Sequence, residues 1–151
     1  MQMEPEVQEV AQQYLAAVRE HTTSQNLAAT IRQLLNENAI YTFFKTAGIQ
    51  EHARNVMVFW DDDQGIVLEV AVQVFAPFTG NGRVFCSSTP AGRVATLLHR
   101  GPWDQIGHTH DAIIRWCRAN HHPMTGLRWE VYGRHNDDPA KLETQVFYLL
   151  K

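Results

Sequence analysis

The chain lacks a surplus of positive charge. Its 151 residues include 13 Lys and Arg against 16 Asp and Glu, which gives a formal net charge of -3 at pH 7. The basic residues are scattered singly, with no cluster that could follow a phosphate backbone. Because nucleic-acid binding depends on neutralising phosphates with Lys and Arg, the composition argues against a direct nucleic-acid partner.

Cysteine is scarce, and long apolar runs are missing. Cys86 and Cys117 are the two thiols, and neither belongs to a CxxC motif, so we expect reduced cysteines rather than a disulfide framework. No apolar run approaches the length of a membrane span, and the first residues show neither the basic nor the apolar region of a signal peptide. The sequence therefore predicts a soluble, cytoplasmic protein with no membrane partner.

Motifs for covalent catalysis and cofactor binding are also missing. The chain has no Gly-rich phosphate loop, GxSxG elbow or Cys–His nucleophile pair. His108 and His110 lie two apart on a predicted helix, roughly 200° around its axis, so they cannot share one ion. His121 and His122 have no further ligand at metal spacing. We therefore expect no metal and no cofactor, and we interpret His99 as satisfying the end of a strand.

The pattern that is present is an alternation of strands and helices in a globular composition, 44% hydrophobic and 19% charged, at a one-domain length. In the first half, residues 7–20 read as a strand, and Thr22 to Ser24 supply an N-cap. A helix follows from about Gln25 to Ala47 and ends at Gly48. Two further strands are predicted on either side of a hairpin turn, at residues 55–60 and 66–74.

The second half repeats this order. Strands are predicted at residues 83–88 and 93–99, followed by a helix from about Trp103 to Ala119. Ile106, Ile113 and Cys117 form the inward stripe of that helix. The closing hairpin comprises strands at residues 127–132 and 142–149.

The two halves, at about residues 5–76 and 82–151, read as an internal repeat within a single domain. Leu68-Glu69-Val70 and Leu142-Glu143-Thr144 lie in corresponding places. A unit that cannot bury its own sheet face alone is expected to pack with its repeat. We predict an α+β fold in which duplicated strand-helix-strand-strand units form an antiparallel sheet with two helices on one face. This organisation leaves no room for a DNA-binding domain, and a cleft between the helices would be a natural pocket.

Glu130 is the strongest candidate for a functional residue. It places a carboxylate in the short aromatic segment Arg128-Trp129-Glu130-Val131-Tyr132, which reads as a packed strand. Residues two apart share a strand face, so Glu130 and Tyr132 point together, away from Trp129. Burying an unpaired carboxylate is costly. One interpretation is a solvated face paired with Arg128; the other is a carboxylate that binds a cationic ligand or transfers a proton.

Aromatic residues supply the candidate lining of the pocket. Trp60 and Tyr132 occupy similar places in the two repeats, so we expect both to face the same cleft. Further candidates for ligand contact lie on the predicted helices and the last strand, namely Tyr41, Phe44, Trp103 and Tyr148. Such a lining would suit a flat or cationic ligand through stacking and cation–π contacts. Trp116 and Trp129 we assign to the core.

Several segments together resemble the GyrI-like small-molecule-binding domain, also called the AraC-type effector-binding or multidrug-sensing domain. The resemblance is closest in the second half. The matching segments are Pro90-Ala91-Gly92-Arg93-Val94-Ala95-Thr96, His99-Arg100-Gly101-Pro102-Trp103, Trp129-Glu130-Val131-Tyr132-Gly133, Asp137-Asp138-Pro139 and Thr144-Gln145-Val146-Phe147-Tyr148-Leu149. The stretch that follows Gly133, Arg134-His135-Asn136, departs from the aromatic residues common there in the family.

The resemblance implies a duplicated fold and a pocket with a glutamate at the position of Glu130, flanked by aromatic rings. In family members fused to a DNA-binding module, that pocket senses bulky and often cationic aromatic compounds. Stand-alone members, the group that this chain resembles, include a gyrase-inhibiting protein. They also include proteins resembling hydrolases of cyclopropane-bearing natural products.

Three functions follow as alternatives. The first is a stand-alone protein that senses or sequesters bulky aromatic, cationic small molecules through Glu130. The second is a hydrolase in which Glu130 is catalytic and activates water against an electrophilic substrate, with help from Tyr132 or His99. The third is a protein-interaction role like gyrase inhibition, with a topoisomerase or regulator as the partner. The sequence favours the first.

Overall fold

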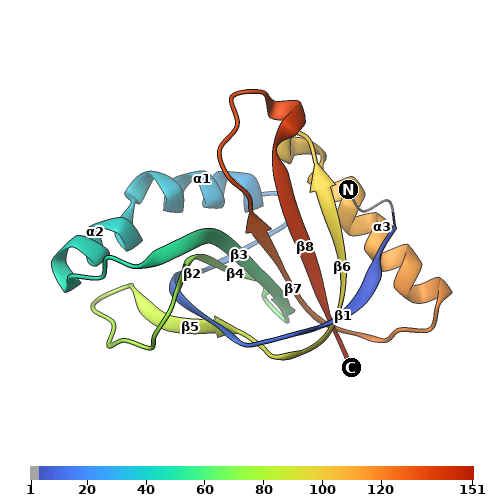
Figure 1. Cartoon of the computed structure of the whole chain (residues 1–151), viewed down its shortest axis with the longest axis horizontal. Helices are drawn as coiled ribbons and strands as arrows, with labels where there is room; N and C mark the ends of the chain where they lie inside the picture. Colours follow the sequence, from blue (N-terminus) through green and yellow to red (C-terminus); the bar gives the residue numbers. More distant parts are fainter. Residues whose placement is uncertain (1–3) are drawn as a thin grey trace. The chain divides into compact units, whose positions relative to one another are not determined.

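A computed structural model describes residues 4–151 of the chain, which form two compact units (Figure 1). The N unit runs from Gln12 to Pro90. The C unit comprises Ala91 to Lys151 together with the N-terminal segment that ends at Ala11. Each unit is an antiparallel sheet with helical segments of its own, and each is described separately below.

The N unit is a four-stranded sheet with two helices. Its strands follow the order β3–β4–β2–β5, and neighbouring strands are antiparallel. The strands are β2 (Gln13–Thr22), β3 (His52–Asp62), β4 (Gly65–Val74) and β5 (Phe85–Thr89). The helices are α1 (Leu27–Glu37) and α2 (Ala39–Ala47), both inserted between β2 and β3.

The single helix predicted from Gln25 to Ala47 is wrong, because the chain breaks at Asn38. Asn38 adopts φ 54° and ψ 33°, a left-handed conformation that ends α1 and precedes α2. Asn visits this conformation more readily than most residues because its short amide can bond to the local backbone. The predicted N-cap at Thr22 to Ser24 is also wrong, since α1 begins after Asn26. Gly48, with φ 71°, ends α2 as predicted.

The helices of the N unit cover one side of its sheet. The Thr22 hydroxyl lies 2.8 Å from that of Thr30 in α1, and the Tyr41 hydroxyl of α2 donates to Asn55 Oδ1 at 3.0 Å. Cross-strand pairing places Thr22 and Asn55 on the same sheet face as the buried residues Leu68, Val70 and Val72. Because side chains alternate along a strand, Glu69 and Trp60 point to the opposite side, away from α1 and α2.

The C unit has the corresponding strand order β7–β8–β6–β1, again antiparallel. Its strands are β1 (Glu6–Val10), β6 (Gly92–Arg100), β7 (Met124–Tyr132) and β8 (Glu143–Leu150). Its helical segments are the short 3-10 turn η1 (Trp103–Gln105), the helix α3 (Ile106–Ala119) and a second 3-10 turn, η2 (Pro139–Lys141). Figure 1 shows α3, in orange, running alongside the strands of this unit.

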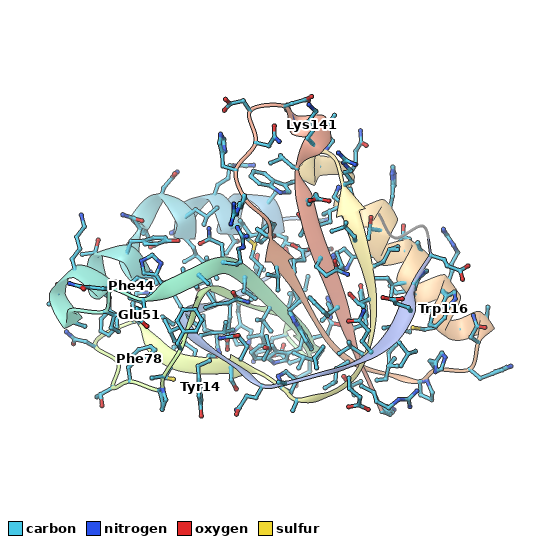
Figure 2. The ribbon with its side chains drawn as sticks, in the orientation of Figure 1. Tyr14, Phe44, Glu51, Phe78, Trp116 and Lys141 are labelled. Atoms are coloured by element: carbon cyan, nitrogen blue, oxygen red, sulfur yellow. The ribbon has the colours of Figure 1, made fainter. Side chains whose placement is uncertain are left out.

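The core of the C unit forms where α3 meets β6 and β8. Ile113 and Cys117 are fully buried, as their inward stripe predicted, and burial raises the pKa of the Cys117 thiol. The buried cluster consists of Ala95, Leu97, Ile113, Cys117, Val146, Tyr148 and Leu150. Val7 of β1 packs against it, so the first strand of the chain contributes to this core. Trp116, labelled in Figure 2, is partly buried against the same cluster and stacks on His122.

The first predicted strand, residues 7–20, is wrong as a single element. β1 ends at Val10 and pairs with β6, whereas β2 begins at Gln13 and pairs with β4 and β5. Each unit thus contains a strand-helix-strand-strand repeat and one added edge strand. The α+β class and the duplicated strand-helix-strand-strand order are confirmed. No helix among residues 4–151 is both long and apolar enough to cross a membrane.

Candidate functional site

Glu130 lies near the end of β7 and is almost entirely buried, with 5% of its surface exposed. Across the ladder it pairs with Val146 of β8, a core residue, so its side chain points to the α3 side of the sheet. Tyr132, two residues along the same strand face, donates a hydrogen bond from its hydroxyl to Glu130 Oε1. The structure therefore brings together the two residues that strand periodicity placed on one face.

His110 of α3 supplies the second contact to this carboxylate. Its Nε2 lies 2.6 Å from Glu130 Oε2, and its Nδ1 lies 2.6 Å from the Tyr148 hydroxyl. The His110 ring also packs edge-on against the Tyr148 ring, with 5.5 Å between centroids. The result is a hydrogen-bonded series from Tyr148 through His110 and Glu130 to Tyr132, which we call the Glu130 cluster.

The sequence interpretation missed His110, because it considered this histidine only as a metal ligand beside His108. The spacing of residues along the predicted helix would have indicated its position. His110, Ile113 and Cys117 follow the i, i+3, i+7 spacing of one helix face, and the last two were already predicted to point inward. A histidine on an otherwise apolar inward stripe needs a polar partner in the core. Among residues 4–151, no group of three or more His, Cys, Asp or Glu side chains is placed to hold a metal ion.

The geometry and burial of the cluster show which of its atoms donate hydrogen bonds and which accept them. Desolvation, together with the nearby charge of Glu130 and the hydrogen bond to it, holds the pKa of Tyr132 well above its ordinary value of 10.0. Tyr132 is therefore protonated and donates, and Glu130 accepts at Oε1. At Oε2 the acceptor is again the carboxylate, so His110 Nε2 carries a proton. Both hydrogen bonds can form with an uncharged donor, so the geometry does not require a positive charge next to the carboxylate.

Trp103 marks the exposed margin of the cluster. Its ring meets that of Tyr132 edge to face, with 6.0 Å between centroids, and 55% of the residue is exposed. It lies in η1, whose start is held by His99: His99 Nε2 lies 2.9 Å from the Pro102 carbonyl, and Nδ1 lies 2.8 Å from the Thr109 hydroxyl. His99 thus ties the end of β6 to α3, in agreement with its interpretation as a strand-end residue.

Thr144 adds a buried hydroxyl beside the cluster. It lies directly opposite Tyr132 across the β7–β8 ladder, so the two side chains point to the same side of the sheet. Thr144 is 1% exposed, and within the described part of the chain its Oγ1 has no hydrogen-bond partner. Buried hydroxyls nearly always have a partner, so the Thr144 hydroxyl is an exception within the described part of the chain.

A second buried glutamate, Glu69, lies in the N unit and was not recognised from the sequence. Glu69 is 2% exposed, and Arg19 donates to its Oε2 from Nε at 3.0 Å and from Nη2 at 2.7 Å. The Ser87 hydroxyl donates to Oε1 at 2.6 Å. The sequence signal was a single Glu inside the apolar strand Ile66 to Val72.

Trp60, a predicted ligand contact, belongs to this second site. The Arg19 guanidinium carbon lies 5.2 Å from the centre of the Trp60 ring and 5.0 Å from that of Phe85. Both rings thus already have a cation of the protein's own over them. Trp60 points away from the helices of its unit, whereas Tyr132 points toward the helix of its own, so the two do not occupy matching places.

The remaining predicted contacts separate into different surroundings. Tyr148 joins the Glu130 cluster. Tyr41 and Phe44 lie together on α2, with their rings edge to face at 5.8 Å, and Phe44 stacks on His52 at 4.8 Å. Phe44, labelled in Figure 2, is a buried core residue of the N unit. Trp129, predicted as core, is 3% exposed and stacks on Phe147.

Comparison with known proteins identifies relatives of this chain. The family described as the GyrI-like small molecule binding domain matches residues 3–151, which confirms the resemblance drawn from the sequence. No curated protein matches the chain by sequence.

Solved structures share the fold at low identity. The EcmrR C-terminal domain superposes with a TM-score of 0.76 at 13% identity, covering 98% of this chain and 97% of that domain. SAV2435 bound to tetraphenylphosphonium gives 0.73 at 13% identity, covering 99% of this chain and 94% of SAV2435. A hydrolase from Listeria innocua gives 0.63 at 12% identity, covering 99% of this chain and 93% of that protein.

Proposed function

This chain belongs to the GyrI-like small-molecule-binding family, and we propose that it binds bulky aromatic cations at Glu130, as a protein that senses or sequesters such compounds. The observation that carries the proposal is a buried carboxylate whose hydrogen-bond partners, Tyr132 and His110, satisfy its oxygens without having to cancel its charge. A cationic ligand would bring a positive charge to this carboxylate.

The electrostatics of burial favour a cation of a particular kind. A carboxylate removed from water loses much of its hydration, and an opposite charge nearby recovers part of that loss. A compact ammonium would itself have to be stripped of tightly held water. A large cation with delocalised or shielded charge is weakly hydrated, so it gives up less on entering the site. The same reasoning explains why such a ligand would gain from aromatic neighbours.

Trp103 and Tyr132 are those neighbours. Their rings stand edge to face, and Trp103 presents more than half of its surface to solvent. An exposed indole beside a buried charge offers a place where an aromatic ligand can stack as it approaches Glu130. Cation–π contacts at exposed sites contribute about 0.5–1 kcal/mol each. The aromatic rings therefore add to an affinity whose main source is the carboxylate.

The solved relatives lend support at the level of fold. SAV2435, with which this chain shares its fold, was solved with tetraphenylphosphonium, a large cation of the proposed class. That ligand is a suitable first probe for this protein.

The direct test is a fluorescence anisotropy titration with a cationic rhodamine dye at pH 8, with tetraphenylphosphonium as the competitor. Wild type should bind saturably, and Glu130→Gln should lose at least tenfold in affinity, because the amide keeps the shape of the carboxylate but not its charge. Glu143→Gln is the matched control: it removes an exposed glutamate from the same unit. Equal affinity in wild type and Glu130→Gln would contradict the proposal.

A hydrolase is the second candidate, favoured by the alignment of Glu130, His110 and Tyr148. Glu130 would accept a proton from water while the water oxygen bonds to a strained ring carbon of the substrate. The ring C–C bond breaks, its electrons pass to the substrate's conjugated carbonyl, and the resulting oxyanion takes a proton from solvent.

Turnover separates the two candidates. A spirocyclopropyl cyclohexadienone would be incubated with the protein and its hydrated product followed by liquid chromatography. Hydrolysis by wild type that disappears in Glu130→Gln would favour the enzyme. Saturable dye binding without turnover would favour the binding protein.

A further inference from the structure

His110 is a titratable cation placed directly against the carboxylate on which the proposed function depends. We infer that His110, when it is protonated, competes with the ligand cation for the Glu130 carboxylate. Protonated, it neutralises Glu130 and excludes a cation; neutral, it leaves the negative charge for the ligand. The inference rests on the proposed function, because it concerns the same carboxylate. It adds a regulated property: ligand binding coupled to the release of a proton.

The geometry accommodates both protonation states of His110 without moving a ring. In both, Nε2 carries a proton and donates to Glu130 Oε2 at 2.6 Å. When Nδ1 is bare, it accepts from the Tyr148 hydroxyl at 2.6 Å; when Nδ1 is protonated, it donates to the same oxygen. The Tyr148 hydroxyl needs only to rotate its hydrogen. The charge next to Glu130 can therefore change by one unit while the hydrogen-bonded series stays intact.

Burial makes that unit of charge effective. The side chain of His110 is 17% exposed and that of Glu130 is 7% exposed. Between groups so far from water, an ion pair is much less screened than on a surface. An imidazolium in contact with Glu130 would therefore remove most of the attraction for an arriving cation. It would also repel that cation directly.

Among the titratable and charged groups near the Glu130 cluster, His110 is the one whose change of protonation would alter the charge next to Glu130. On β7, Tyr132 stays protonated because burial raises its pKa, and the Arg128 guanidinium donates to the Gly126 carbonyl at 2.9 Å. On β6, His99 bonds to the Thr109 hydroxyl and the Pro102 carbonyl, whereas His110 bonds to the Glu130 carboxylate itself. Before α3, Asp104 is exposed, and on α3 so are His108 and Asp111. Histidine is the side chain that ordinarily titrates between pH 5 and 8.

The expected effect is a linkage between ligand and proton. Where His110 is protonated in the free protein and neutral in the complex, one proton leaves for each ligand bound. The affinity should then rise about tenfold for each pH unit and level off once His110 is already neutral. A ligand that is itself always charged, such as tetraphenylphosphonium, keeps its own titration out of the measurement.

The test is isothermal titration calorimetry with tetraphenylphosphonium from pH 5.5 to 8.5. At the acidic end, titrations are repeated in two buffers with different ionisation enthalpies, which counts the protons released by wild type without any substitution. Three variants complete the series. His110→Gln keeps a donor toward Glu130 but cannot become charged; His110→Arg supplies a permanent charge; His108→Gln removes an exposed histidine from the same helix as the matched control.

We expect wild type and His108→Gln to bind more tightly as the pH rises, with proton release at acidic pH. His110→Gln should bind with one affinity throughout, and His110→Arg should lose binding throughout. The inference is overturned if wild-type affinity does not change with pH, or if His110→Gln keeps the wild-type pH dependence. No saturable binding by wild type or His110→Gln, even at pH 8.5, would instead contradict the proposed function itself.

Discussion

The two units each bury one glutamate, and they treat it differently. In the N unit, Glu69 is held by the guanidinium of Arg19, which is always charged. In the C unit, Glu130 is held by His110 and Tyr132, which satisfy its oxygens and can both be neutral. The first arrangement is a permanent ion pair between side chains of the protein. In the second, the partner of the carboxylate is positively charged only when His110 is protonated.

The position of each glutamate relative to the helices fits this difference. Glu69 points to the side of its sheet away from α1 and α2, where Arg19 lies across the Trp60 and Phe85 rings. Glu130 points toward α3, which supplies His110. A carboxylate beside aromatic rings is thus insufficient to identify a ligand site. The two glutamates differ in whether a permanently charged side chain of the protein contacts the carboxylate.

Arg19→Gln should produce the largest change in stability. It leaves Glu69 buried and charged without its cation, and removal of one partner of a buried pair is strongly destabilising. Because Arg19 is 49% exposed, solvent screening reduces the loss, and we expect about 2–3 kcal/mol of the free energy of unfolding. Urea denaturation measures it. The double variant Arg19→Gln with Glu69→Gln should recover most of the loss; recovery of none would show that Arg19 acts through packing on Trp60 and Phe85.

Tyr132→Phe should have an intermediate effect in the C unit. It removes a donor to Glu130 and leaves Oε1 buried without that hydrogen bond, which costs about 1–2 kcal/mol. The raised pKa of Tyr132 adds a pH signature. Above pH ~10, ordinary tyrosines of the unfolded chain ionise while Tyr132 does not, so wild-type stability falls as the pH rises through that range.

Urea denaturation at pH 8 and at pH 10.5 tests the sign of this effect. The difference in stability between wild type and Tyr132→Phe should shrink at the higher pH, because the variant has no such group to lose. Tyr14→Phe, at a tyrosine of the N unit without a contact to Glu130, is the control for the general alkaline response. A difference that grows with pH would mean that Tyr132 is more readily ionised in the folded protein.

The sequence predicted much of the C unit and less of the N unit, for identifiable reasons. Strand periodicity placed Glu130 and Tyr132 on one face, and the stripe of α3 gave Ile113 and Cys117. The contact between His110 and Glu130 could not be predicted from local periodicity, because it joins residues 20 positions apart. The break at Asn38 was missed because the apolar spacing continues across it. The passage from β1 to β2 was missed because both segments have strand-like composition while pairing in different units.

Trp103→Ala should have the smallest effect. Trp103 is 55% exposed, so its removal should leave the free energy of unfolding nearly unchanged. Loss of one exposed cation–π contact, about 0.5–1 kcal/mol, corresponds to roughly a two- to fivefold weaker affinity for tetraphenylphosphonium. Calorimetry with Trp116→Ala as a control separates loss of this ring from loss of any tryptophan. Unchanged affinity in Trp103→Ala would place the ligand away from the exposed margin of the cluster.

The most direct test of the central claim compares the two glutamates in one experiment. Tetraphenylphosphonium binding would be measured by calorimetry at pH 8 in wild type, Glu130→Gln and Glu69→Gln, with the fold of each variant checked by circular dichroism. We expect one site per chain in wild type and Glu69→Gln, and binding at least tenfold weaker in Glu130→Gln. Binding that survives in Glu130→Gln but is lost in Glu69→Gln would contradict the claim.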